Sequence, residues 1–440
     1  MKLRFENLGA IKQLEIDLCK KLTVFCGPNG TGKTYAAYAV YGFIKLLLVG
    51  DPIFKLNELI EKKKIEVSLN FESIYKKEQF YANFFKTWIQ EVFGTKSLDF
   101  FNSFNTDLIT TKEEFVSSAK ALSFDFSYLY ENVLIKYKKK SNSNKMSVSL
   151  PESVSLNTIT ELTEVYHLAI ITKYILNNTL LNSYILPVER NSVYTFISEL
   201  TLNKIDEKQL SGKENKKDRY PLPIRDAISV AGDLATIKKS ESEYKYLAEE
   251  IERIILHGKV SVSEDGEMQF TSDKANEKIL PIHLTASIIK NISGLLIYLK
   301  HQAKRNDLLI IDEPELGLHP DNQILITRIF GKLIKKGIRI LVCTHSDYII
   351  RELNNLIILS SKKGEIKKKA QEFGYEMDEL IYPSDVGAYL FDFNSDNNNL
   401  VSVEKLLVDK SGFEVKTIDK AISELNNRSM DLFFALKEEE

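Results

Sequence analysis

GPNGTGKT, residues 27–34, decides the fold, because it fits the pattern of a phosphate-binding loop placed between a strand and a helix. The apolar run 22–26 predicts a short buried strand, and residues 35–40 predict a helix whose positive end faces the loop. The glycines let the backbone curl with its N–H groups inward, which forms a nest for phosphate. We expect Lys33 to reach the β- and γ-phosphates and the Thr34 hydroxyl to bind Mg2+; the alternative is a chance glycine-rich turn.

The composition is typical of a globular enzyme of the cytoplasm. The 440 residues are 44% hydrophobic and 27% charged, which allows a large core divided into more than one lobe. Cys19, Cys26 and Cys343 lie at no metal-ligand spacing and predict buried free thiols in a reducing compartment. No apolar run approaches a membrane span, and no signal peptide is expected. The net charge of −2 gives no overall electrostatic reason to bind nucleic acid.

A second motif, LLIIDEPE at residues 308–315, predicts a strand buried on both faces of a parallel sheet, because four apolar β-formers precede two acids. The acids would emerge at the carboxyl end of the strand, where open α/β sheets bind their ligands. We expect Asp312 to hold Mg2+, directly or through water, and Glu313 to polarise the attacking water as a general base. The alternative is a pair of acids that merely ends a strand.

A third motif places a histidine after another buried strand. The apolar run 339–344 predicts this strand, and His345 and Ser346 follow it. A histidine at that edge of the sheet can sense a γ-phosphate by donating a hydrogen bond, whereas a core histidine would be structural. The position after the third strand favours the sensing role.

The remaining elements follow from periodicity. Residues 2–8 and 13–18 predict half-buried strands, residues 64–71 alternate again, and the aromatic-rich stretch 79–129 is expected to be helical. No sustained heptads occur, so a long coiled-coil arm is not expected. Further predicted elements are a hairpin over 131–150, a helix over 156–180, a strand over 183–188, a mobile loop over 207–219, helices over 225–235 and 241–256, a hairpin over 257–271, strands over 388–393 and 400–417, and a closing helix over 418–426.

A lysine-rich turn, residues 138–145, lies within the first predicted hairpin. Lysines in a polar turn are usually a solvated loop tip, and this is the interpretation we favour. A contact with nucleic acid is the alternative.

With these motifs in place, the chain resembles the ABC-type ATPase heads of the SMC, RecF and OLD-nuclease grouping. Residues 27–34 correspond to Walker A, 308–313 to Walker B and His345 to the switch histidine. Residues 315–320 are similar to the segment that forms the D-loop contact between subunits, and residues 186–190 and the second hairpin are similar to the same subgroup. The resemblance implies an α/β P-loop ATPase head with a mixed or parallel core sheet, an antiparallel β subdomain and helical insertions.

The signature sequence of that family, Leu-Ser-Gly-Gly-Gln, is absent. The candidate in its place is LTAS, residues 284–287, at the start of a predicted helix. Ser287 precedes Asp312 by 25 residues, similar to the family's spacing, and lies where a helix N-terminus can meet a γ-phosphate. The alternative is an ordinary N-cap serine.

The resemblance implies ATP and Mg2+ as cofactors, and it assigns the site residues. Catalysis is assigned to Glu313, His345 and Lys33, and Mg2+ binding to Thr34 and Asp312. The nucleotide would be bound by Asn29, Gly30, Thr31, Gly32, Lys33 and Thr34, together with Ser287.

Four segments are expected along the chain: an N-terminal ATPase lobe (1–78), a helical and hairpin insertion (79–182), a strand return with a second insertion (183–275) and a C-terminal ATPase lobe (276–440). The pattern of a Toprim nuclease is missing after the head, so any nuclease would be a separate chain.

The resemblance implies ATP hydrolysis coupled to closure of a homodimer or higher homo-oligomer. The chain would be the sensor or scaffold subunit of a bacterial anti-phage complex, similar to PARIS or Septu, and would control a separate nuclease or toxin effector. One alternative is a RecF-like ATPase that acts on DNA, and another is a nucleotide-gated scaffold with little hydrolysis. DNA or a phage component is a further candidate partner; a membrane is not expected.

Overall fold

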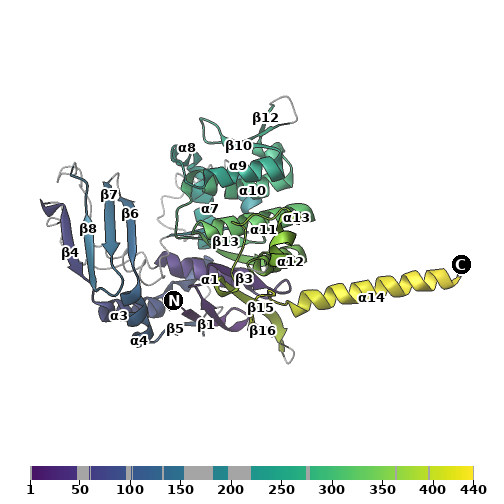
Figure 1. The fold of residues 1–440 in the computed structure, drawn as a ribbon, viewed down its shortest axis with the longest axis horizontal. Helices are drawn as coiled ribbons and strands as arrows, with labels where there is room; N and C mark the ends of the chain where they lie inside the picture. Colours follow the sequence, from purple (N-terminus) through teal and green to yellow (C-terminus); the bar gives the residue numbers. More distant parts are fainter. Residues whose placement is uncertain are drawn as a thin grey trace, which may run out of the picture.

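The computed structural model shows a head from which a long C-terminal helix extends (Figure 1). The helix predicted over 156–180 and the loop predicted over 207–219 lie outside the residues that the structure describes. The described residues are 2–46, 59, 61–95, 101, 103–130, 133–152, 182–196, 220–273, 278–361, 364–394 and 397–439.

A nine-stranded mixed sheet forms the centre of the head (Figure 1). In spatial order its strands are β5 (Asn105–Leu108), β1 (Lys2–Leu8), β2 (Ile11–Asp17), β16 (Asn397–Leu406), β15 (Val386–Asn394), β3 (Leu22–Cys26), β14 (Arg339–Thr344), β13 (Asp307–Asp312) and β9 (Asn182–Leu186). The run from β15 to β9 is parallel, whereas β1 pairs antiparallel with β2 and β5, and β15 pairs antiparallel with β16. The predicted α/β class with a mixed core sheet is confirmed.

The central strands are buried on both faces, as their unbroken apolar runs predict. Along β13, Leu308 and Ile310 belong to one hydrophobic core, whereas Leu309 and Ile311 belong to the other. Successive side chains of a strand point to opposite faces, so this alternation places one core on each side of the sheet. The carboxyl ends of β3, β13 and β14 therefore lie side by side at one edge.

Helices cover both faces of this sheet. The helix α1 (Lys33–Leu46) contributes to the same core as Leu308, whereas α10 (Ser287–Ile297), α11 (Pro320–Lys335) and α12 (Asp347–Leu359) contribute to the core on the opposite face. The helices predicted over 225–235 and 241–256 are also confirmed. They are α7 (Leu222–Gly232), α8 (Leu234–Ile237), α9 (Lys245–Ile251) and a π-helical turn over Glu252–Leu256, and a short helix α13 (Gly364–Glu372) follows α12.

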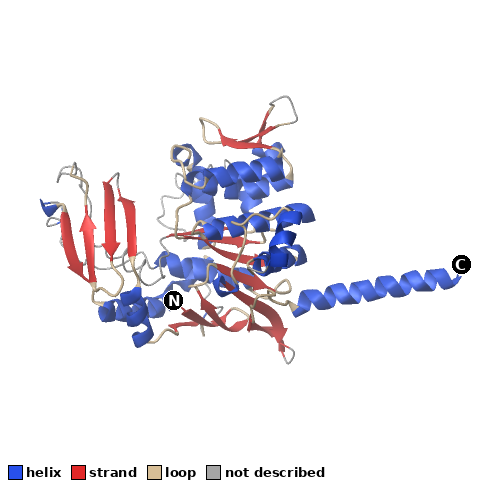
Figure 2. Cartoon of the chain, viewed as in Figure 1, coloured by secondary structure: helices blue, strands red, loops and turns tan. Residues whose placement is uncertain are grey.

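An antiparallel insertion stands beside the head (Figure 2). Its sheet has the order β4 (Lys64–Ser68), β8 (Lys145–Ser149), β7 (Val133–Lys139) and β6 (Phe124–Tyr130), and its helices are α3 (Phe71–Phe93) and α4 (Lys112–Ala121). The prediction of a helical stretch over 79–129 is therefore wrong in part, because β5 pairs with β1 and β6 pairs with β7. Aromatic residues suit both strands and buried helix faces, so the local pattern did not distinguish them.

The lysine-rich turn of this insertion is solvated only in part. Lys139 is 2% exposed, and its ammonium donates to the main-chain oxygens of Lys120 (2.8 Å) and Leu122 (2.5 Å) at the end of α4. Burial lowers the pKa of Lys139. Lys138 pairs with Asp125 at 3.0 Å. The prediction of a solvated loop tip is wrong for Lys139, which holds the turn against α4.

Two further predictions concern the later hairpin and the C-terminal region. The hairpin is confirmed as β10 (Gly258–Val262) and β11 (Met268–Ser272), and β12 (Ile279–Pro281) joins it. The strands predicted up to residue 417 are wrong beyond β16, where the described chain forms an isolated bridge between Asp409 and Gly412. The closing helix is α14 (Lys416–Glu439), much longer than the predicted 418–426.

Two further expectations concern the burial of the three cysteine thiols and the presence of a membrane-spanning helix. Cys26 and Cys343 are buried, but Cys19 is exposed, so the prediction that all three thiols are buried is wrong for Cys19. Burial raises the pKa of Cys26 to about 12. Within the described part of the chain, no helix is long and apolar enough to cross a membrane.

Candidate functional site

The phosphate loop lies at the carboxyl end of β3. Gly27, Gly30 and Gly32 have φ angles of 130°, 78° and 83°, a region that glycine adopts without strain. A Cβ added at Gly27 would lie 2.0 Å from the carbonyl oxygen of Phe391 on β15, so no side chain fits there. Because α1 begins at Lys33, its first unpaired N–H groups face the loop, where they can bind an anion.

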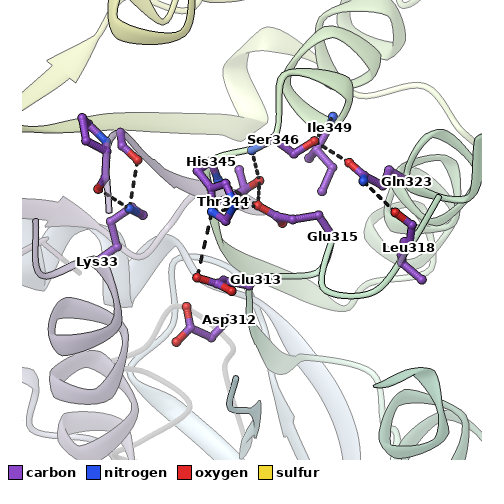
Figure 3. Close-up of polar contacts among 12 residues, drawn as sticks. Lys33, Asp312, Glu313, Glu315, Leu318, Gln323, Thr344, His345, Ser346 and Ile349 are labelled. Carbon is purple, nitrogen blue, oxygen red and sulfur yellow. Dashed lines mark hydrogen bonds and ion pairs between the residues drawn. The ribbon is translucent and has the colours of Figure 1, made fainter. Parts of the chain in front are cut away.

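The Lys33 side chain folds into the loop (Figure 3). Its ammonium donates to the carbonyl oxygens of Gly27 (2.9 Å) and Pro28 (2.7 Å), and burial is the main cause of its lowered pKa. Thr31 is buried and donates to the same Pro28 oxygen at 2.8 Å, whereas Asn29 is exposed at the tip. The loop is thus closed by its own lysine, and a bound phosphate can accept the same hydrogen bonds.

The Thr34 hydroxyl joins the first motif to the second. It donates to Oδ2 of Asp312 at 2.8 Å, although the two residues are 278 positions apart. Asp312 is 1% exposed at the end of β13, and burial raises its pKa to about 6, opposed by the Thr34 hydrogen bond. Two neighbouring ligands of octahedral Mg2+ lie about 3 Å apart when each bond is about 2.1 Å. The hydroxyl and carboxylate oxygens therefore fit an Mg2+ site completed by phosphate and water.

Glu313 has an unusual backbone. Its φ is 48°, in the left-handed region that costs a non-glycine residue about 1–2 kcal/mol. Both main-chain groups are held: its N–H donates to the carbonyl oxygen of Cys343 (2.9 Å), and its carbonyl accepts from Arg190 (2.7 Å). The turn directs the Glu313 carboxylate toward the His345 ring, where Oε1 and Nδ1 are 3.9 Å apart (Figure 3).

A buried glutamate, Glu315, supports His345. The sequence pattern assigned Glu315 no role beyond its place in the segment 315–320, which is similar to a segment that contacts another subunit. Oε1 of Glu315 accepts from the Thr344 hydroxyl (2.8 Å) and from the His345 N–H (2.8 Å), and it lies 3.4 Å from His345 Nδ1. The Glu315 side chain is 7% exposed, whereas that of His345 is 42% exposed. Glu315 therefore fixes the strand end and leaves the His345 ring accessible, which is inconsistent with a core histidine.

The same network continues into the segment after the second motif (Figure 3). The Ser346 hydroxyl donates to Oε1 of Gln323, and Nε2 of Gln323 donates to the carbonyl oxygen of Leu318 at 2.9 Å. Ser346 also caps α12 by accepting from Ile349. The chain around His345 is thus connected to the segment expected to contact another subunit.

Ser287 lies apart from the phosphate loop of its own chain. It is the exposed first residue of α10, and the N-cap is Ala286, whose side chain makes no capping bond. The alternative of an ordinary N-cap serine is therefore wrong. A Cβ added at Gly317 would lie 3.6 Å from the Ser287 Cβ, which places the serine beside the segment 315–320. The described contacts include no hydrogen bond from Ser287 to residues 27–34.

Arg190 is a positioning residue to which the sequence pattern assigned no role. It is 3% exposed, lies four residues beyond the end of β9, and its guanidinium donates to the carbonyl oxygens of Asp312 (2.7 Å) and Glu313 (2.7 Å). It also donates to the carbonyl oxygen of Asn291 on α10 (3.1 Å). Burial lowers its pKa. The one signal in the sequence was the position of this arginine shortly after the strand predicted over 183–188. The carbonyl groups that Arg190 binds could not be identified from the sequence.

Replacement of Arg190 by methionine is expected to lower the free energy of unfolding by about 2–5 kcal/mol, because buried carbonyl oxygens would lose their donor. Arg190→Lys retains the charge but not the planar set of donors, so an intermediate loss is expected. Urea unfolding followed by circular dichroism measures both. Equal stability of Arg190→Met and wild type would contradict this role.

Comparison with known proteins gives one family and several distant structures. The family model described as "AAA ATPase domain" matches residues 1–350. The comparison with curated protein sequences found no match.

Three of the similar solved structures are SMC heads. One is an SmcHead bound to the C-winged helix domain of ScpA (10% identity, TM-score 0.37, 93% of this chain and 98% of that chain). Another is an Smc head domain with an extended coiled coil bound to the C-terminal domain of ScpA derived from Pyrococcus furiosus (11%, 0.34, 97% and 98%). A third is the SMC head domain from Thermotoga maritima (11%, 0.32, 92% and 98%). Likeness at this distance carries no inference about ligands or partners.

Proposed function

The chain belongs to the family of AAA ATPase domains, and on that premise we propose that it binds ATP with Mg2+ and hydrolyses ATP to ADP and phosphate. The observation that carries the proposal is the 2.8 Å hydrogen bond between Thr34 and Asp312, because it joins the phosphate loop to the acidic strand end. Glu313 and His345 stand at the same edge of the sheet, 3.9 Å apart. A chance glycine-rich turn would not bring these groups together.

Each residue has a role that its position supports. Lys33 would exchange its hydrogen bonds to the loop carbonyls for bonds to the β- and γ-phosphates, and Thr34 and Asp312 would hold the metal. Bound Mg2+ neutralises negative charge on the phosphates. Glu313 would accept the proton of the attacking water, and His345 would donate to the γ-phosphate.

We further propose that the complete site contains two copies of the chain. Ser287 is exposed beside the segment 315–320 and makes no described contact with residues 27–34 of its own chain. A helix N-terminus with an exposed hydroxyl suits the γ-phosphate bound by a facing copy. Closure on ATP would then place Lys33 of one copy and Ser287 of the other on the same nucleotide.

This arrangement predicts complementation. Ser287→Arg and Lys33→Ala should each remove ATPase activity alone, since every site in either homodimer lacks one residue. A mixed dimer has one site with both residues intact, so equal mixing should restore up to about a quarter of wild-type turnover. Phosphate release measures this, with Ser287→Ala as a milder variant. Absence of any recovery would contradict the composite site.

As the biological role, we propose the sensor or scaffold subunit of a bacterial cytoplasmic anti-phage complex that controls a separate effector. The proposal rests on the resemblance of the motifs at 27–34, 308–313 and 315–320 to the ATPase subunits of such systems. Co-expression with the neighbouring open reading frame tests it: stoichiometric co-purification of an effector is expected. Strong stimulation of turnover by DNA alone would instead favour a RecF-like ATPase, and co-purification with almost no turnover would favour a nucleotide-gated scaffold.

A further inference from the structure

The helix α14 extends away from the head (Figure 1), and several of its apolar side chains are exposed. Leu425 is 64% exposed, Leu432 is 73% exposed and Leu436 is 59% exposed. Large apolar side chains gathered on one exposed helix usually mark a contact surface. We propose that α14 pairs with α14 of a second copy of this chain as a parallel, two-stranded coiled coil, in the absence of nucleotide.

The spacing of the apolar residues supports a helical partner. Ile418, Ile422, Leu425, Leu432 and Leu436 fall at alternating steps of four and three once Ser429 is included. This is the heptad spacing that keeps a stripe facing a second helix. The stripe spans fewer than three heptads, so it does not contradict the expectation of no sustained heptads; the closing helix predicted over 418–426 was too short to contain it.

The heptad positions favour a second copy in parallel orientation. In the middle of the stripe, Ile422 at an a position with Leu425 and Leu432 at d positions is the arrangement typical of parallel dimers. Two residues at the ends depart from it, Leu436 at an a position and Ile418 at a d position, but Ile418 is partly buried against the head. Ser429 is the one polar residue at an a position of the stripe. In a parallel, in-register pair, each seam residue packs against the same residue of the partner helix. A helix identical to α14 supplies this match at every layer.

The charges agree with the same partner and orientation. The other charged residues of the stripe region lie off the seam, and Arg428 alone flanks the middle of it. In a parallel pair Arg428 would face Phe433 of the partner helix, a favourable cation–π contact. An antiparallel pair centred on the stripe would instead bring the two Arg428 side chains together, which is unfavourable.

The exposed area reaches what a specific dimer needs. If Ile422, Leu425, Leu432, Phe433 and Leu436 each cover about 100 Å2, the five side chains of each helix bury about 1,000 Å2 in total, the lower limit for a specific interface. Ile418 adds little to this area, because it is already partly buried against the core of the head. The pairing needs no bound nucleotide and so does not depend on the proposed ATPase function. It would tether two heads at one end before ATP binds.

The first test is the mass of the full chain without nucleotide, measured by light scattering after size exclusion. Wild type is expected at twice the 50.4 kDa of one chain, and Leu425→Asp/Leu432→Asp at the monomer mass. Phe434→Asp is the matched control, because Phe434 is 55% exposed in the same turn but lies on the face opposite the seam. A monomeric wild type, a dimeric seam variant or a monomeric control would each overturn the proposal; a monomeric wild type would leave the stripe to a different protein.

The second test reports orientation. Ser429→Cys, made with Cys19→Ser to remove the exposed native thiol, should form a disulfide-linked dimer on mild oxidation, because a parallel register places the two Cys residues within disulfide reach. Asn427→Cys lies off the seam and should remain largely uncrosslinked. Crosslinking at position 427 but not 429 would overturn the parallel register, while retained ATP binding in these variants would show that only the pairing had failed.

Discussion

Replacement of Glu313 by glutamine is expected to lower kcat for ATP hydrolysis by about a hundred- to thousandfold while ATP affinity stays near that of wild type. Glutamine has the same shape but cannot accept a proton from water. The Glu313 side chain is 30% exposed beside His345, and its two main-chain groups are held by Cys343 and Arg190, so the substitution should leave the backbone unchanged. Steady-state phosphate release and calorimetric titration with ATP measure the two quantities.

Two controls separate the chemistry from general damage. Glu372→Gln removes a 57%-exposed carboxylate paired with Lys369 outside the site and should leave kcat unchanged. Glu315→Gln alters a buried carboxylate that accepts from the Thr344 hydroxyl and the His345 N–H, so a loss of thermal stability is expected there. Turnover of Glu313→Gln equal to wild type would assign the general base to another residue.

Replacement of Lys33 by alanine is expected to weaken ATP binding about a hundredfold or more, because charge-assisted hydrogen bonds to the phosphates would be lost. The Lys33 ammonium is 2.9 Å and 2.7 Å from the carbonyl oxygens of Gly27 and Pro28, within the loop itself. Burial lowers the pKa of Lys33, which means that the charged ammonium is disfavoured in the loop when no phosphate is bound. Stability without nucleotide should therefore change much less than ATP affinity.

The comparison that isolates Lys33 uses another lysine of the same helix. Lys45 lies in the last turn of α1 and pairs with Asp226 at 3.4 Å, away from the loop. Lys45→Ala should bind ATP as wild type does, as measured by calorimetry under identical salt. Near-normal affinity of Lys33→Ala would remove residues 27–34 from the nucleotide site.

The sequence alone determined the elements that carry the site, because their signals are local. An unbroken apolar run that ends in acids or in a glycine-rich loop indicates a strand buried on both faces, and the strands at 22–26, 308–312 and 339–344 are found in the core sheet. Parallel neighbours bring their carboxyl ends to one edge, so the approach of Thr34 to Asp312 followed from the same pattern.

The tertiary structure alone decided which main-chain groups the buried polar side chains meet. Arg190 binds the carbonyl oxygens of Asp312 and Glu313, and Lys139 binds those of Lys120 and Leu122. Neither set of targets has a residue-specific signal in the sequence, because every residue carries the same carbonyl group.

The short strand β5 and the length of α14 were also missed. A four-residue strand depends on its partner β1 more than on its own sequence, and helix α14 continues past the point where its packing against the head ends. Local periodicity records what one segment prefers, whereas these features depend on segments distant in the sequence.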